Sequence, residues 1–129
     1  MKEIRLLYVE DEADIREVAS FALEGEGFEL LLCASGSEAL EQAEAFRPDL
    51  ILLDVMMPGM DGQTTFRHLR EIVALQHVPA IFLNAKVQSQ QVDELMRLGA
   101  VEVIAKPFDP LGLAAQIRTI WRGLSSTRS

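Results

Sequence analysis

Residues 49–62 read DLILLDVMMPGMDG, and this stretch decides the fold. Its first part, Leu50 to Leu53, is the most apolar run that the chain offers for a strand, and it ends at the carboxylate of Asp54. The proline and the glycines that follow mark a loop. A short apolar run bounded by turn residues is typical of a buried strand. The segment therefore predicts a strand of a parallel sheet in an α/β protein.

On both sides of this segment, short apolar runs typical of strands alternate with stretches of helical periodicity. Four more short apolar runs predict strands at Ile4–Val9, Phe28–Cys33, Ala80–Leu83 and Val101–Ala105. Each strand is followed by helical periodicity. The predicted helices are Ala13–Glu26 with Ile15 and Val18 facing inward, Ser35–Phe46, a helix with Phe66, Leu69 and Val73 on one face, Ser89–Leu98 and Pro110–Arg122. Parallel strands joined by helices require right-handed crossovers that cover both faces of the sheet. We expect a single domain with a doubly wound, five-stranded parallel sheet flanked by five helices.

Length and composition limit the class of protein. The chain has 129 residues, of which 49% are hydrophobic and 25% charged, and this balance fits one globular domain. We place that domain at residues 1–124 and a frayed polar tail at 125–129. One cysteine and two histidines argue against a disulfide framework and against a zinc site rich in Cys or His.

The charge and the apolar runs indicate where the protein works. The formal net charge of -8 repels phosphate backbones, so direct binding to nucleic acid is not expected. The sequence contains neither an apolar run of bilayer length nor a signal-peptide pattern. We therefore expect a cytoplasmic protein without membrane insertion.

Polar residues follow the predicted strands at the edge where such a fold binds its ligands. They are Glu10, Asp11 and Glu12 after the first strand, Asp54 after the third, Asn84, Ala85 and Lys86 after the fourth, and Lys106 after the fifth. Clustered carboxylates repel one another and need a cation, and hard oxygen ligands favour Mg²⁺. Lys106 would add a fixed positive charge. Such a site is equipped to receive a phosphoryl group.

Three stretches at these strand ends together resemble a known family. LLYVEDE at 6–12, DLILLDVMMPGMDG at 49–62 and KPF at 106–108 are similar to the motifs of the response-regulator receiver domain of two-component signalling. The resemblance covers the chain from about Ile4 to Leu124 and implies a CheY-like, flavodoxin-like fold. It implies a signalling module and not an enzyme. Such a module accepts a phosphoryl group from a sensor histidine kinase or a phosphotransfer protein.

The resemblance also assigns roles to individual residues. Asp54 matches the phosphoacceptor, and Glu10 and Asp11 match the acidic pair that holds Mg²⁺ together with it. The remaining matches are the backbone carbonyl of Met56 as a metal ligand, Lys106 as the partner of a phosphoryl oxygen, the backbone N–H of Ala85 at the site, and Pro107, which usually follows the lysine through a cis bond in this family.

Two positions depart from the family pattern. Asn84 stands where Thr or Ser usually binds the phosphoryl group, and its amide is larger and two-sided although it can donate a hydrogen bond. Val103 stands where an aromatic ring usually rotates on phosphorylation. The residues for phosphoryl transfer are complete, whereas the usual residues for the readout are not.

Three functions stay open at this point. The first, which we expect, is a phosphorylated receiver without an output domain of its own, which contacts an unknown target. Candidate contact residues near its output face are Val87, Gln88, Gln90, Gln91 and Arg97. The second is a pseudo-receiver that binds partners constitutively. The third is a Mg²⁺-dependent phosphohydrolase of the haloacid dehalogenase type. It is disfavoured because Met56 stands where such enzymes place a general acid and base.

Overall fold

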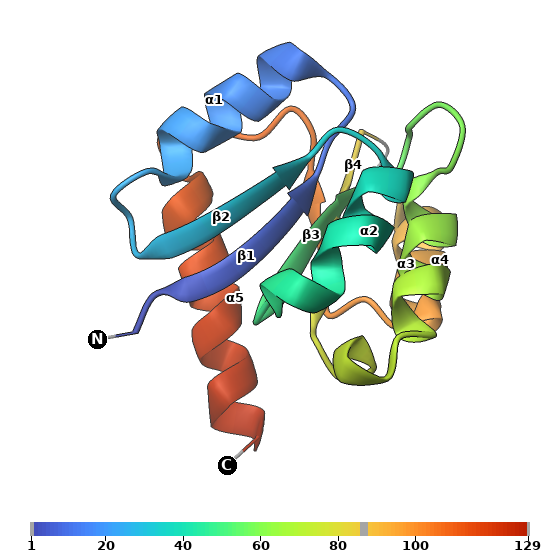
Figure 1. Ribbon diagram of the computed structural model, residues 1–129. Helices are drawn as coiled ribbons and strands as arrows, with labels where there is room; N and C mark the ends of the chain where they lie inside the picture. Colours follow the sequence, from blue (N-terminus) through green and yellow to red (C-terminus); the bar gives the residue numbers. More distant parts are fainter. Residues whose placement is uncertain (1, 86–87, 129) are drawn as a thin grey trace.

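A five-stranded parallel sheet forms the centre of the molecule, and helices cover both of its faces (Figure 1). The computed structural model describes residues 2–85 and 88–128. The strands are β1 (Ile4–Val9), β2 (Phe28–Cys33), β3 (Leu50–Asp54), β4 (Ala80–Asn84) and β5 (Glu102–Ala105). The helices are α1 (Ala13–Leu23), α2 (Gly36–Phe46), α3 (Gly62–Arg70), α4 (Ser89–Leu98) and α5 (Leu113–Arg128), with a 3₁₀ turn at Val73–Leu75. The predicted doubly wound fold is confirmed.

The strand order is β2-β1-β3-β4-β5, so the direction of winding reverses between β1 and β3. These two strands pair in parallel, with Leu6 opposite Leu50 and Val9 opposite Leu53. Their carboxyl ends therefore lie side by side at the same height. In open α/β sheets this reversal point is the usual place for a ligand.

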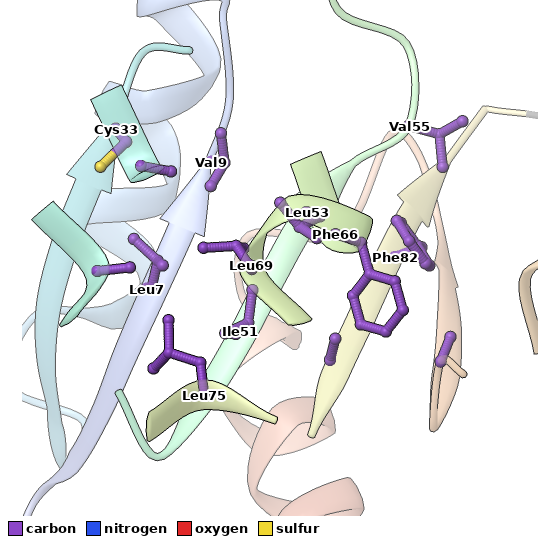
Figure 2. Packing of buried hydrophobic residues seen from close by; sticks show 14 of the residues in the cluster. Leu7, Val9, Cys33, Ile51, Leu53, Val55, Phe66, Leu69, Leu75 and Phe82 are labelled. Carbon is purple, nitrogen blue, oxygen red and sulfur yellow. The ribbon is translucent and has the colours of Figure 1, made fainter. Parts of the chain in front are cut away.

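Two apolar layers hold the sheet. Alternation along the strands sends Leu7, Val9 and Ile51 to one face, where they pack against α2, α3 and α4 (Figure 2). Leu6 and Tyr8 point to the other face, where they pack with residues of α1 and α5. All five residues of β3 are buried, as expected for the central strand. The core is continuous on each face and fixes the positions of the strand ends.

The first predicted helix is too long. The structure ends α1 at Leu23, three residues before the predicted end at Glu26. Gly25 and Gly27 both adopt positive φ angles, of 73° and 94°, which continue the chain as a turn into β2. Such angles suit glycine because it has no Cβ.

Two other helix predictions also differ from the structure. Val73 lies outside α3, in the separate 3₁₀ turn, where it is 81% exposed, and Leu75 occupies the buried position instead. The last helix begins at Leu113, after Pro110, because the Asp109 carboxylate accepts a hydrogen bond from the N–H of Leu111 (3.0 Å) and stabilises a local turn. Residues 125–128, predicted as a frayed tail, belong to α5.

Two residues named in the sequence analysis, Lys86 and Val87, lie outside the described residues. Within 2–85 and 88–128, the structure contains no helix that is both long enough and apolar enough to cross a membrane. The Lys106–Pro107 peptide bond is cis, as the family resemblance implies.

The N-cap of α3 gives a test of local stability. The Asp61 carboxylate accepts a hydrogen bond from the N–H of Thr64 (2.8 Å), and this bond holds the pKa of Asp61 below its usual value. We expect Asp61→Ala to lower the free energy of unfolding in urea by about 1 kcal/mol, because the first turn loses its cap.

The same cap predicts a dependence on acid. A lowered folded-state pKa gives a stabilisation that is present above the usual carboxyl pKa and is lost as the pH falls through the folded-state value. Asp61→Asn keeps a capping oxygen but does not titrate, so its stability is expected to fall less steeply with acid than that of the wild type. Parallel acid profiles for the two proteins would contradict this assignment.

Candidate functional site

Three carboxylates gather where β1 and β3 end. Glu10 and Asp11 directly follow β1, and Asp54 is the last residue of β3. One carboxylate oxygen of each of the three side chains lies within 4.8 Å of an oxygen of each of the other two. Glu10 is fully buried and Asp54 nearly so, whereas Asp11 is partly exposed. The cluster therefore has an inner side in the protein and an outer side that solvent reaches.

Lys106 bridges two of these carboxylates. Its Nζ donates to Oε1 of Glu10 (2.8 Å) and to Oδ2 of Asp54 (3.0 Å). The lysine directly follows β5, the edge strand, so its side chain reaches past the end of β4 to arrive at β3. The structure thus joins residues that are 96 and 52 positions apart in the sequence.

Burial and charge act in opposite directions at this site. Burial raises the pKa of Glu10, and the hydrogen bond from Lys106 offsets only part of that effect. Burial lowers the pKa of Lys106, but its hydrogen bonds to Glu10 and Asp54 outweigh burial and raise the pKa above its usual value. One ammonium group does not balance three carboxylates. The site favours an additional cation.

The donor set fits Mg²⁺. Carboxylate oxygens are hard ligands, and Mg²⁺ binds oxygens at about 2.1 Å, so that ligands on opposite sides lie about 4.2 Å apart. The three carboxylate oxygens of the cluster lie within 4.8 Å of one another, which is compatible with this arrangement. Oxygens of Glu10 and Asp54 also accept hydrogen bonds from Lys106, and the assignment of Glu10, Asp11 and Asp54 as ligands of the ion stays a prediction.

A pocket of about 470 Å³ opens over the cluster. Its polar lining includes Asp11, Asp54 and Lys106, and Met56 and Ala85 also line it. An external group can therefore reach the Asp54 carboxylate. The predictions for the backbone groups of Met56 and Ala85 stay predictions, but both residues lie at the pocket.

The apolar wall of this pocket is the part that sequence analysis missed. Ile15 and Val18 of α1 line it together with Pro107 and Phe108. Helical periodicity predicts Val18 on the buried face, but its side chain is 43% exposed. The signal was ambiguous because an apolar helix position next to a strand-end loop can face either the core or the mouth of a pocket.

Asn84 takes a different place from the other predicted residues. It is the last residue of β4 and is buried, but it is not among the residues that line the pocket. Alternation along β4 puts it on the same face as Phe82, toward α2, α3 and α4. Val103 lies partly buried on that face as well.

Gly62 allows α3 to start against the end of β3. Its N–H donates to the carbonyl of Val55 (3.0 Å). A Cβ at this position would lie 2.2 Å from the carbonyl oxygen of Asp54, a distance that no packed atom pair tolerates. The glycine is therefore required for the backbone of Asp54 to keep its place.

Comparisons with known proteins agree with this geometry. The model of the response regulator receiver domain matches residues 6–118. The chain belongs to the receiver domain family. The chain is 40% identical over 120 residues to the transcriptional regulatory protein CseB of Streptomyces coelicolor. The aligned region covers 93% of this chain and 50% of CseB. It is also 40% identical over 114 residues to the DNA-binding response regulator MtrA of Mycobacterium tuberculosis, with coverage of 88% and 49%.

Solved structures show the same fold. The chemotaxis protein CheY4 of Vibrio cholerae superimposes with a TM-score of 0.85 at 30% identity, covering 92% of this chain and 98% of CheY4. A response regulator from Desulfuromonas acetoxidans gives a TM-score of 0.82 at 27% identity, with coverage of 94% and 98%. The chain spans about half the length of the curated relatives that it matches.

The acidic cluster gives a test of metal binding. We expect Mg²⁺ to raise the free energy of unfolding of the wild type, by about 1.4 kcal/mol when its concentration is ten times the dissociation constant. Asp11→Asn removes one ligand charge and should lose most of this stabilisation. Glu12→Gln is the matched control, because Glu12 is the neighbouring acid but lies outside the cluster. Equal Mg²⁺ responses in the two variants would argue against the assignment of Asp11.

Proposed function

We propose that this receiver domain accepts a phosphoryl group on Asp54, in a Mg²⁺-dependent reaction, from a phosphohistidine of a sensor histidine kinase or a phosphotransfer protein. The observation that carries the proposal is the position of Asp54, whose carboxylate lies in an open pocket with Lys106 at 3.0 Å and Asp11 beside it. In the transfer, an oxygen of Asp54 bonds to phosphorus while the phosphorus–nitrogen bond of phosphohistidine breaks, and its electron pair returns to the imidazole ring.

Each residue of the site has a role in this proposal. Asp54 is the nucleophile, held by the buried end of β3 and by the close approach of Gly62. Lys106 orients the Asp54 carboxylate before transfer and then pairs with an oxygen of the transferred group. A cation held by Glu10, Asp11 and Asp54 would neutralise charge on the phosphoryl oxygens. The N–H of Ala85 and the carbonyl of Met56 complete the proposed set.

A pseudo-receiver is the second candidate function. Asn84 and Val103 favour it, since the first is not at the pocket and the second has no ring to rotate. The acidic cluster argues against it, because a silent site has no physical need to bury Glu10 and Asp54 next to each other. A phosphohydrolase is disfavoured by Met56, whose thioether cannot transfer protons and whose side chain is 73% exposed.

The comparisons indicate the kind of pathway. CseB is named as a transcriptional regulatory protein and MtrA as a DNA-binding response regulator, and this chain matches about half of each. We propose that the domain works in the cytoplasm and passes its state on by contact with another protein surface. Its net charge of -8 supports the view that these residues do not themselves bind DNA.

Intact-mass measurement tests the phosphoacceptor. Incubation with acetyl phosphate and Mg²⁺ should add one phosphoryl group to the wild type and none to Asp54→Asn, because the amide is not a nucleophile. Asp54→Asn is expected to fold, since it removes a charge from an acidic cluster and keeps the shape of the side chain. A wild type that binds Mg²⁺ but gains no mass would favour the pseudo-receiver.

Lys106 should matter after transfer. We expect Lys106→Ala to bind Mg²⁺ nearly as well as the wild type. Phosphorylation should stabilise this variant less, by about 1.5 kcal/mol, because a charge-assisted hydrogen bond to the phosphoryl group is missing. The measurement is the difference in unfolding free energy between phosphorylated and unphosphorylated protein. If this difference were the same in both proteins, Lys106 would not sense the phosphoryl group.

A further inference from the structure

Tyr8 carries a buried polar group that the proposed mechanism does not use. The residue lies in β1 and is fully buried. Its hydroxyl group has no hydrogen-bond partner within the part of the chain that the structure describes. Leaving a buried donor unpaired costs about 1–3 kcal/mol, and phenylalanine would fill the same space without that cost. The hydroxyl group therefore needs an explanation outside the fold of the unmodified domain.

The position of Tyr8 places it next to the acidic site. Alternation along β1 puts Tyr8 on the same face as Glu10, one step earlier in the strand. Its partner in β3 is Leu52, which lies two residues before Asp54, just as Tyr8 lies two residues before Glu10. On its other side Tyr8 pairs with Leu32 of β2. The surrounding row of the sheet is apolar, so the acidic cluster is the polar environment nearest to this phenol along the strand.

The electrostatics agree with this position. Burial raises the pKa of Tyr8 well above its usual value, and the negative charges of Glu10 and then Asp54 raise it further. The two carboxylates therefore act on the phenol through the protein interior. The hydroxyl group keeps its proton and is available as a hydrogen-bond donor.

The proposed function creates a need for such a donor. In the present structure Lys106 donates to Glu10 and Asp54 at the same time. When Lys106 pairs with a phosphoryl oxygen, Oε1 of Glu10 loses its donor. Glu10 is fully buried, and its Oε2 keeps the hydrogen bond from the N–H of Glu12, but the Oε1 atom of a buried carboxylate is destabilised when it has no donor.

We infer that Tyr8 is a positioning residue whose hydroxyl group donates a hydrogen bond to Glu10 when Lys106 turns to the phosphoryl group. This inference rests on the proposed function. It accounts for a hydroxyl group without a partner in an apolar row, and it gives Oε1 of the buried Glu10 a donor in both states of the site.

The test compares the wild type with Tyr8→Phe in three measurements. The free energy of unfolding without Mg²⁺ should be unchanged or higher in Tyr8→Phe, since the hydroxyl group has no partner in that state. The affinity for Mg²⁺ alone should agree within about twofold, because Lys106 still donates to Glu10. The affinity for beryllofluoride with saturating Mg²⁺, a stable mimic of the phosphoryl group, should fall by roughly tenfold, the effect of one hydrogen bond to a charged group.

A double-mutant cycle identifies the acceptor. In a Glu10→Gln background, Tyr8→Phe should change the affinity for beryllofluoride much less than it does in the wild type, because the charged acceptor is absent. An effect of equal size in both backgrounds would assign the hydroxyl group to another acceptor and overturn the inference.

Other outcomes also decide the question. Wild-type affinity for beryllofluoride in Tyr8→Phe overturns the inference and leaves the proposed function intact. A loss of stability in unliganded Tyr8→Phe also overturns it, since the hydroxyl group would then serve the unmodified fold. If the wild type itself neither gains a phosphoryl group nor binds the mimic, the proposed function fails and the inference fails with it.

Discussion

Buried negative charge at the reversal point of the sheet is the constraint on which the rest of the structure depends. Glu10 directly follows β1 and Asp54 ends the adjacent strand β3, so the parallel pairing of Val9 with Leu53 brings the two carboxylates together. Lys106 compensates them from β5, on the far side of β4, with hydrogen bonds of 2.8 and 3.0 Å. The strand order therefore determines how the negative charge is compensated. From the end of β5, the side chain of Lys106 reaches both carboxylates and lines the pocket beside them.

The packing below the site makes this arrangement stiff. β3 is buried along its whole length between two apolar layers, so Asp54 cannot withdraw into solvent to relieve repulsion. Gly62 brings the start of α3 against the Asp54 backbone, where a Cβ would approach the carbonyl oxygen to 2.2 Å. A site that cannot relax by moving its backbone has to neutralise its charge by binding. In the proposed function, this rigidity favours the binding of a cation and of a phosphoryl group with its metal.

How far the sequence predicts the structure differs between its parts. The apolar run at Leu50–Leu53 determines a central strand, and parallel strands bring their carboxyl ends together, so the grouping of Asp54 with Glu10 follows from pattern alone. Val73 shows the limit of periodicity. The helical pattern predicts Val73 on the buried face of α3, but α3 ends before this residue, and Leu75 is buried instead. The bridge made by Lys106, the exposure of Val18 at the pocket and the unpaired hydroxyl group of Tyr8 depend on interatomic distances, which a pattern of residue types does not contain.

The two positions that depart from the family pattern lie on another face of the sheet than the acidic cluster. Asn84 and Val103 lie toward α2, α3 and α4, whereas Tyr8 and Leu52, which precede Glu10 and Asp54 in their strands, face α1 and α5. Lys106 contacts the carboxylates directly, and Val103 has no ring that could follow its movement. The side chains that share hydrogen bonds with Lys106 are Glu10 and Asp54. In the proposed function, the hydrogen bonds that a charge on Asp54 would alter directly are therefore those of Lys106 and Glu10, on the side of the sheet opposite to Phe82 and Val103.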